Sequence, residues 1–521
     1  MKRCKYTPKT LVDLPDELLL RCLVLAARRG NVVRSLQSFA RYQLLCSRIK
    51  EVIEHRAQIQ WQTAHISPEF CDEEELGHYI NWLIDHYPNN LVRRIEAKMQ
   101  SWNDDRASVH HLCMLCNCFS DTVDTLVLQV DNLDQKDNRQ MSQQFEAALY
   151  KLSYLKSMAI EVSTRLSLQL PHIPSLERMC LKLPRDATTR AAAYILANQT
   201  SLRSLFLTCF GWVPERGGCE PFGGFLERFE ALRELSLRVG VVGLSILFSG
   251  ASKPFEVLKN LHIGVLAQQK NLDTLHQVFP QLEQLTLAIG TPLSSSLLYD
   301  GSRMRFKNLK ALELQHVRIG DSAEMLAPLT ALQSLSLRHC EVRYCDGLSS
   351  MAALEDLELV ENSVVHSLRG IESLKKLRIV VCSARILDLE ALGYLPAVDK
   401  LQLLDSGTCV RNIPWSKKAF TQSIRGLVIS SSLCVKKGSF PKLEALSITG
   451  NGPDDVGSFT EAVIESGAHL RYAEWTGYIS VCGMKFAVDY PRAAWHFVYR
   501  NPHDVARYGR ESRFLLQESE V

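Results

Sequence analysis

An apolar triplet of the form L-x-x-L-x-L recurs through most of this 521-residue chain and constrains its fold more than any other feature. A local pattern repeated at a near-fixed spacing predicts a stack of similar units, each packed only on its neighbours. Such a stack presents a broad surface to a partner rather than a closed pocket. The clearest copies of the triplet begin at Leu202, Leu232, Leu282, Leu309, Leu332 and Leu354.

The middle apolar residue of each triplet gives the length of the repeat. Successive middle residues are 19 to 32 positions apart, with an average of about 25. The L-x-L alternation within each copy is typical of a short strand, so we expect the strands to stack in parallel while the chain returns along the convex side. The predicted middle positions are Leu126, Met158, Met179, Leu205, Leu235, Leu261, Leu285, Leu312, Leu335, Leu357, Leu377, Leu401, Leu427 and Leu446.

These repeats resemble the leucine-rich-repeat family over roughly 350 residues. The family pattern continues to an Asn or Cys that turns inward and bonds to loop backbone. Asn362, Cys340, Cys382 and Asn451 stand at that offset, whereas other repeats lack such a residue. The resemblance implies an α/β leucine-rich-repeat solenoid. We expect Cys340 and Cys382 to be structural rather than reactive, because buried cysteine behaves mostly as a small apolar residue.

A second recognisable segment lies near the amino terminus. Residues 14–19 read Leu-Pro-Asp-Glu-Leu-Leu, and proline and acidic residues before an apolar run are typical of a helix start. This segment resembles the opening of an F-box, and residues 46–53 resemble the tail of that family's motif. Ile49 replaces the usual aromatic residue, and residues 27–32 lengthen the spacing. An alternative register matches residues 38–42 to the middle of the motif.

The F-box resemblance implies an all-helical unit that docks on the adaptor subunit of a cullin–RING ubiquitin ligase and, through it, on cullin. In this kind of docking, apolar side chains at helical spacing fill a complementary groove. A competing interpretation is that the same helices only cap the solenoid, since a Leu-Pro-Asp-Glu start suits either role. The resemblance assigns adaptor binding to Leu14, Pro15, Leu18, Leu19, Leu23, Leu36 and Ile49.

These patterns divide the chain into five segments. Residues 92–97 have the form of a degenerate first repeat, and Trp495 and Phe497 are expected to help seal the far end of the stack. The segments are a flexible tail at 1–10, an F-box-like helical unit at 11–55, a helical linker or N-terminal cap at 56–120, the leucine-rich-repeat solenoid at 121–475, and a C-terminal cap and tail at 476–521.

Side chains that flank the inward leucines are predicted to point to the open concave surface. Counted from the predicted middle positions, Glu358 should neighbour Arg378. Asp356 should likewise neighbour Lys376. We interpret the mixed-charge patch as a candidate substrate contact zone. The alternative is a self-paired, solvated sheet surface, since opposite charges on adjacent strands stabilise each other. The candidate residues are Arg338, Asp356, Glu358, Lys376, Arg378 and Lys400.

Composition narrows the classes of partner. The chain has 60 basic and 57 acidic residues, and a net charge of +3 is too weak to predict nucleic-acid binding. No apolar run is long enough to span a membrane, and no signal-type core follows the basic start, so we expect neither a membrane nor a secretory protein. The 16 cysteines are then expected to be reduced thiols in the cytoplasm or nucleus.

Three features that could carry chemistry do not lead us to predict a catalytic, metal or cofactor site. Residues 110–118 contain a C-x-x-C pair, but a structural zinc site needs four ligands and no second pair stands nearby. The glycine-rich segment 217–224 lacks the Lys-Ser/Thr end of a phosphate loop. His262 is a single residue without a visible nucleophile to activate.

The sequence therefore predicts a non-catalytic substrate receptor. Its N-terminal helices would hold the ligase adaptor, and its repeats would hold an unknown target protein near the ubiquitin-charged enzyme, so that the rate gain comes from proximity. The rival prediction is a leucine-rich scaffold or inhibitor that has no connection with a ligase.

Overall fold

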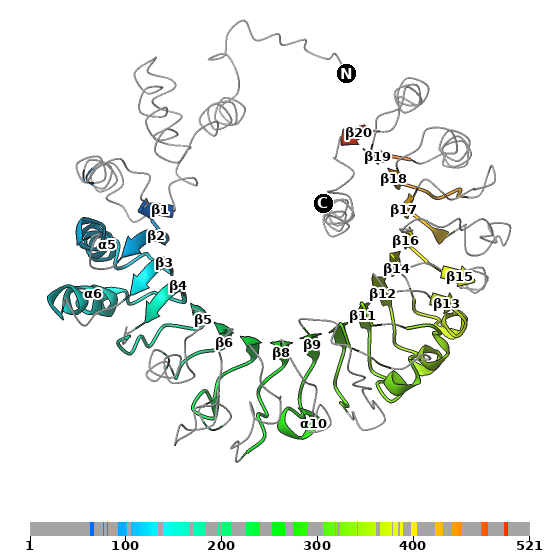
Figure 1. Cartoon of the computed structure of the whole chain (residues 1–521), viewed down its shortest axis with the longest axis horizontal. Coiled ribbons are helices and arrows are strands. Elements are labelled where there is room, and N and C mark those ends of the chain that lie inside the picture. Colours follow the sequence, from blue (N-terminus) through cyan, green and yellow to red (C-terminus); the bar gives the residue numbers. More distant parts are fainter. Residues whose placement is uncertain are drawn as a thin grey trace, which may run out of the picture. The chain divides into compact units, whose positions relative to one another are not determined.

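The computed structural model divides into two compact units, Met1–Val241 and Val242–Val521. Within each unit, short strands lie side by side and the connecting segments lie on their outer side (Figure 1). None of the described helices has the length and apolar character needed to cross a membrane. The structure describes residues 63–66, 77, 81, 92–101, 106–133, 139–166, 170–183, 196, 200–209, 224, 226–239, 253–265, 275–289, 306–317, 319, 323–340, 342–360, 365–377, 379–383, 386–388, 398–403, 423–430, 440–450, 470–477 and 494–498.

The first unit contains seven strands among its described residues, and each pairs in parallel with the next one along the chain. Helix α5 (Arg106–Cys118) connects β2 to β3, and helix α6 (Arg139–Lys151) connects β3 to β4. Both helices lie on the outer side of the strands (Figure 1). The strands are β1 (Thr63–Ile66), β2 (Arg94–Ser101), β3 (Thr125–Leu133), β4 (Ser157–Leu166), β5 (Arg178–Leu183), β6 (Ser204–Cys209) and β7 (Glu234–Val239).

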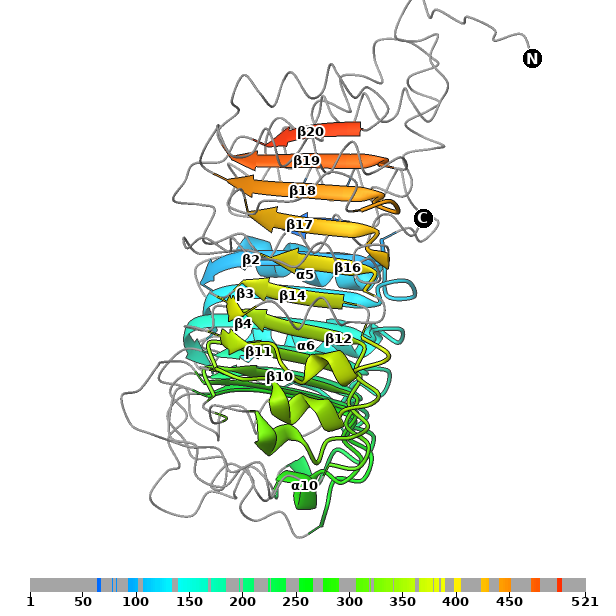
Figure 2. The same ribbon diagram turned by 90° about the vertical axis from the view of Figure 1, so that its right-hand side faces the viewer.

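The second unit repeats the arrangement with eleven described strands in one parallel sheet. Figure 2 shows the last four of them pointing the same way. The strands are β8 (Asn260–Val265), β9 (Gln284–Ile289), β10 (Ala311–Gln315), β11 (Ser334–Arg338), β12 (Asp356–Val360), β14 (Ile379–Ser383), β16 (Lys400–Leu403), β17 (Gly426–Ser430), β18 (Ala445–Gly450), β19 (Tyr472–Gly477) and β20 (Ala494–Val498).

Short elements occupy the outer side of the second unit. The return segments contain helix α10 (Leu275–Val278) and three 3₁₀ turns, η5 (Glu324–Leu326), η6 (Asp346–Ser350) and η7 (Ile371–Ser373). Strands β13 (Val365–Ser367) and β15 (Ile386–Asp388) form a separate parallel pair there. The turns pack closely, since a Cβ atom added at Gly347 would lie 2.3 Å from the backbone nitrogen of Glu324.

The register confirms the predicted repeat at thirteen of the fourteen middle positions. Each of these residues pairs with another predicted middle residue on a neighbouring strand, as Leu312 pairs with Leu335 and Leu335 with Leu357. The same holds from Leu126 to Leu235 in the first unit and from Leu261 to Leu446 in the second, apart from Leu377. The fold of both units is that of a leucine-rich-repeat solenoid.

The prediction for Leu377 is wrong by three residues. Leu357 pairs with Val380, which in turn pairs with Leu401, so Val380 is the middle residue of this repeat. Apolar residues at 374, 377 and 379 imitate the triplet, and the pattern by itself does not separate the two phases. With Val380 in the middle, the spacing from Leu357 is 23 residues, which matches the 23 and 22 of the two preceding repeats.

Three rows of buried apolar side chains form the core of each unit. In the repeat of β11 these are Leu332, Leu335 and Leu337, which are at most 1% exposed. Leu335 and Leu337 point to the same side because alternate residues of a strand do so, and the residues between them stay partly exposed. Burial of a leucine side chain contributes about 1.5–3 kcal/mol, so each added repeat extends a continuous apolar core.

Two backbone hydrogen bonds to the preceding repeat fix the start of most strands. The amide groups of Gln333 and Ser334 both donate to the carbonyl oxygen of Lys310, at 2.7 and 2.9 Å. In the first unit, Lys156 and Ser157 donate in the same way to Asp124, both at 2.9 Å. These bonds occupy backbone groups that burial would otherwise leave without a partner, and they hold adjacent strands in one register.

Charges of alternating sign accompany this ladder in the second unit. The Glu283 carboxylate accepts a hydrogen bond from Nζ of Lys259 at 2.6 Å and from Nζ of Lys310 at 2.8 Å. These three residues precede β8, β9 and β10, so the ion pairs link three successive repeats. The hydrogen bonds, first the one from Lys259 and then the one from Lys310, lower the pKa of Glu283 to about 2.

The structure differs from the prediction of a helical linker over residues 56–120. That segment contains β1 and β2 as well as α5, and β2 pairs in parallel with β3. The degenerate repeat at 92–97 is therefore part of the stack, with Val92, Ile95 and Ala97 buried. At the other end, β20 lies inside the predicted cap and pairs in parallel with β19, so repeat-like strands extend past residue 475.

The predicted adaptor-binding residues all lie outside the described residues. They are Leu14, Pro15, Leu18, Leu19, Leu23, Leu36 and Ile49.

The Glu283 ion pairs predict an acid-sensitive contribution to stability. A carboxyl group with a lowered pKa in the folded state stabilises the fold above its unfolded pKa, near 4.5, and loses this contribution as the pH falls toward 2. We expect Glu283→Gln to flatten the dependence of the midpoint of unfolding on pH within that interval. Glu256→Gln is the control, since Glu256 is exposed and makes no ion pair with any described residue. Identical pH profiles for Glu283→Gln and the parent chain would contradict the assignment.

Candidate protein-binding surface

One side chain in two along each strand faces away from the core. In β5 the pattern leaves Arg178 and Lys182 exposed and Cys180 half-buried, while Met179 and Leu181 are buried. The described helices lie on the other side of the strands (Figure 1). The face without helices is therefore lined by strand side chains, and this is the surface on which the sequence placed the candidate contact residues.

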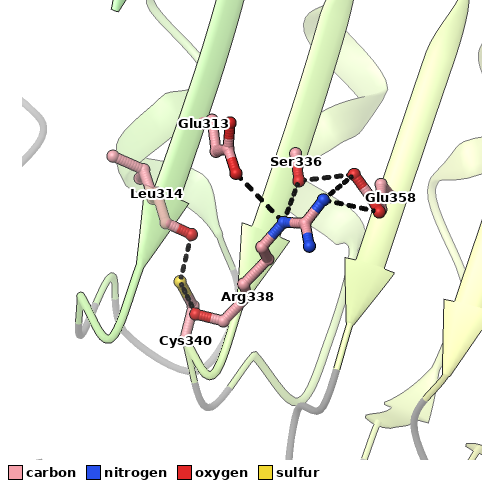
Figure 3. Close-up of polar contacts among 6 residues, drawn as sticks. All are labelled: Glu313, Leu314, Ser336, Arg338, Cys340 and Glu358. Carbon is pink, nitrogen blue, oxygen red and sulfur yellow. Dashed lines mark hydrogen bonds and ion pairs between the residues drawn. The ribbon is translucent and has the colours of Figure 1, made fainter. Parts of the chain in front are cut away.

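Arg338 is the centre of a polar cluster on this face of the second unit (Figure 3). Its Nε lies 3.0 Å from Oε1 of Glu313 on β10 and donates to Oγ of Ser336 at 3.3 Å. A terminal guanidinium nitrogen donates to both carboxylate oxygens of Glu358 on β12, at 3.0 and 3.1 Å. Ser336 also donates to Glu358, at 2.7 Å. The cluster therefore joins three adjacent strands.

Burial makes this cluster more than a surface ion pair. The side chains of Arg338 and Glu358 are 15% and 12% exposed, and Glu313 is 39% exposed. Charge-assisted and bidentate hydrogen bonds are stronger than neutral ones, and partial burial reduces their screening by solvent. For Arg338 and Glu358, the geometry therefore favours the self-paired interpretation, in which the charges stabilise the sheet and do not bind a partner protein.

The predicted partners of Glu358 and Asp356 are wrong in register. Glu358 pairs with Val381 rather than Arg378, and Asp356 pairs with Ile379 rather than Lys376. The cause is the three-residue error at Leu377, which moved both basic residues onto the strand. Lys376 is exposed in the turn before β14, and Arg378 lies outside the described residues.

Lys400 does start a strand as expected, at the first position of β16. It pairs with Ile379, so one strand separates it from Asp356. The six candidate residues thus do not form one patch. Arg338 and Glu358 meet in the cluster, whereas Asp356 and Lys400 are two strands apart and Lys376 precedes its strand.

Cys340 is a structural residue, as its position after Leu337 predicts. It is buried, and its Sγ donates to the carbonyl oxygens of Leu314 and Arg338, both at 3.2 Å. Burial raises the pKa of this thiol to about 12, although nearby backbone hydrogen bonds lower it. Cys382 has a different role from the one predicted. It pairs with Leu359 and therefore occupies the last apolar position of its triplet.

Two of the three cysteines of α5 belong to the buried side of the helix. Cys113 and Cys116 are buried beside Leu112, Leu115 and Phe119, whereas Cys118 is exposed. Burial raises the pKa of Cys113 to about 11 and raises that of Cys116 further. Among the described residues, no three His, Cys, Asp or Glu side chains are placed to hold a metal ion.

Phe206 is an exposed aromatic residue on β6 that the sequence analysis did not include among the candidate contact residues. Phe206 lies in the middle of β6 between the buried Leu205 and Leu207 and is 43% exposed. The available signal was its place in the pattern, because a large aromatic residue between the two leucines of L-x-L has to point away from the core. Several repeats that follow β6 have polar residues at this position, such as Ser236 and Thr286.

A scan against protein-family models and a search of curated proteins find no match to this sequence. Among solved structures, a leucine-rich-repeat protein of Leptospira interrogans is similar at 17% identity and a TM-score of 0.44, over 73% of this chain and 92% of that one. An internalin of Listeria monocytogenes is similar at 15% identity and a TM-score of 0.34, over 68% of this chain and 81% of that one. Superpositions this loose add nothing to the register and buried rows of the chain itself.

The Arg338 cluster predicts strong coupling between two side chains. In a double-mutant cycle with Arg338→Met and Glu358→Gln, we expect each single change to cost about 1–3 kcal/mol of unfolding free energy, because it leaves a partly buried polar group without its partner. The matched cycle uses Lys182 and Glu161, which form a 3.0 Å ion pair that is 52% and 41% exposed. An exposed pair should couple by no more than about 1 kcal/mol. Equal coupling energies in urea titrations of the two cycles would refute the structural role of the cluster.

The thiols should differ in reactivity as their burial differs. Under native conditions at neutral pH, we expect iodoacetamide to modify the exposed Cys118 well before Cys340, because the buried thiol is both inaccessible and protonated. Site-resolved mass spectrometry over time measures the order, and modification after denaturation serves as the reference for full reactivity. Early modification of Cys340 in the folded protein would show that its place in the core is misassigned.

Proposed function

We propose that this chain is a non-catalytic protein-binding receptor that holds a target protein on the strand face of its repeats. The observation that carries the proposal is the strand face itself, which leaves every second side chain outside the core and has no described helix across it. A fold alone does not define a function, whereas an open surface of this kind can hold a partner.

The chemistry of the face supports a protein as the ligand. Strands spaced about 4.8 Å apart present side chains in regular rows, which suits an extended contact with another folded chain or peptide. The rows of the first unit mix exposed cations and carboxylates, such as Lys182 and Glu161, with the aromatic Phe206. Protein interfaces commonly combine aromatic anchors with charged groups around them.

We further propose that the N-terminal segment 11–55 connects this receptor to the adaptor of a cullin–RING ubiquitin ligase. The support is the sequence alone, above all the Leu-Pro-Asp-Glu-Leu-Leu run at 14–19. In this role the repeats would hold the target and the helices would bring it to the ubiquitin-charged enzyme, in the cytoplasm or nucleus. The reaction would gain from effective concentration, without a catalytic side chain in this chain.

The second candidate function is a leucine-rich scaffold or inhibitor that binds a protein without any ligase. The open strand face supports it equally well, since that face does not depend on residues 11–55. The two candidates differ only in whether the amino-terminal segment binds an adaptor.

Co-purification from cells separates these functions. We expect the intact chain to retain the ligase adaptor, and a chain lacking residues 11–55 to lose it, because the deletion removes the apolar docking residues. A chain lacking only residues 1–10 is the control and should still retain the adaptor. Equal thermal midpoints for the three chains would show that the repeats remain folded.

A second variant avoids a deletion. Leu14→Asp combined with Leu18→Asp places charges among the proposed docking residues and should abolish adaptor binding in the full chain. If the intact chain never retains the adaptor under conditions in which it retains a target protein, the ligase proposal fails and the scaffold function stands.

A further inference from the structure

Phe206 heads an apolar strip on the open face of the first unit. The register places Val127 of β3, Ala159 of β4, Cys180 of β5 and Phe206 of β6 side by side in one row. The first three are partly exposed and Phe206 is 43% exposed. With strands about 4.8 Å apart, the strip, here called the Phe206 strip, extends about 14 Å across the face.

The strip is apolar along its whole length. Burial is the main cause that raises the pKa of Cys180, so its thiol is neutral and acts as a small apolar group. A contiguous apolar surface among polar residues marks a place where another molecule binds, because leaving it in water is unfavourable. Among the residues of β1 to β18 whose exposure the structure describes, Phe206 is the one large hydrophobic side chain that is exposed within a strand of the sheet.

Four residues lie diagonally next to Phe206 on the two neighbouring strands, and three of them are cations. Arg178 and Lys182 lie on β5 and Arg238 on β7, each one strand across and two residues along from Phe206. Strand spacing and rise per residue place such positions about 8 Å from Phe206, Cα to Cα. Lys182 pairs with Glu161 at 3.0 Å, whereas Arg178 and Arg238 make no ion pair with any described residue. Two exposed guanidinium groups therefore remain available beside the ring.

A carboxylate, Glu234, occupies the fourth position diagonally next to Phe206, and it is hydrogen-bonded within the sheet. Glu234 accepts a hydrogen bond from Oγ of Ser204 at 2.8 Å, on the row that also contains Arg178. The row on the other side of Phe206 holds Glu161, Lys182, Thr208 and Arg238, and its one carboxylate, Glu161, is paired with Lys182. The charge next to the ring is thus mainly positive, although the face as a whole is mixed.

We propose that the Phe206 strip binds an acidic segment of a partner protein, in which an apolar side chain covers Phe206 and flanking carboxylates pair with Arg178 and Arg238. This inference rests on the proposed function and names the kind of segment that the strand face takes. A central aromatic residue with charged groups around it is typical of a binding hot spot, in which the apolar contact gives affinity and the charges give orientation.

A nucleic acid is a less suitable ligand for the Phe206 strip and the cations next to it. An aromatic residue among cations can stack a base, but a phosphate backbone along the face would meet Glu161 and Glu234 next to the strip. The net charge of the chain is only +3, far from the concentrated positive surface that such backbones require. The mixed charges favour discrete carboxylates on a protein segment.

Selection of peptides that bind the full chain tests this inference. A random peptide library displayed on phage is selected on the parent chain and, in parallel, on Phe206→Ser. We expect the parent alone to enrich sequences with a large apolar residue next to Asp or Glu. In fluorescence anisotropy, an enriched peptide should bind Phe206→Ser at least about ten-fold more weakly, as expected for a hot-spot residue.

Matched variants separate the ring from the charges. Arg178→Glu with Arg238→Glu should weaken the same peptide, and a peptide with Lys in place of its acidic residues should regain binding to this double variant. The controls are Tyr150→Ser, which removes an aromatic residue that is 67% exposed on α6, and Lys151→Glu with Lys156→Glu, which changes the charge equally. All variants should keep the thermal midpoint of the parent.

Three outcomes would overturn the inference. The first is no enrichment on the parent, and the second is enriched peptides that bind Phe206→Ser as well as the parent. The third is a single-stranded oligothymidine that binds the parent more tightly than any peptide and loses binding in Phe206→Ser, which would make the strip a nucleic-acid surface. If enriched peptides are insensitive to Phe206→Ser but are displaced by a captured target protein, the receptor function survives and only this site is wrong.

Discussion

The burial of three apolar rows against the same rows of the next repeat is the constraint on which the rest of the structure depends. Leu332, Leu335 and Leu337 have no core of their own, because a single repeat is too small to enclose them. Paired backbone bonds, such as those from Gln333 and Ser334 to the Lys310 carbonyl, set the register that lets the rows meet. Side-chain ion pairs such as Glu283 with Lys259 and Lys310 then reinforce a register already fixed by the backbone.

This constraint also decides what the strand face contains. Because the leucines occupy one side of every strand, the residues between them are forced outward whatever their chemistry. In the second unit that row includes Glu313, Ser336 and Glu358, which Arg338 joins into a self-paired cluster. In the first unit the same row holds Cys180 and Phe206. These side chains are apolar but point away from the leucine core, and Phe206 is left exposed. This row therefore differs between the two units: its side chains bond to one another in the second unit and form an apolar strip in the first.

The repeat pattern predicted most of the strands, because its period is set by local sequence and needs no knowledge of distant residues. It failed at Leu377, where two apolar phases overlap within six residues and only pairing with Leu357 and Leu401 selects Val380. It indicated a degenerate repeat at residues 92–97 but left it in the linker segment, since one strand position of that repeat is Ala97 rather than leucine. The prediction of the site was less accurate than that of the strands, because side-chain partners depend on the register. A shift of three residues placed Val381 rather than Arg378 beside Glu358.

The sequence by itself determined that this chain forms leucine-lined parallel repeats and that Cys340 belongs to their core, because both follow from spacing along the chain. It also supplies the entire case for an adaptor-binding segment at residues 11–55. Only the tertiary structure decided that Arg338 is held by Glu313 and Glu358, and that Phe206 stands exposed between Arg178 and Arg238. These neighbours come from different repeats, 20 or more residues apart, and they come close to one another only once the strands have paired.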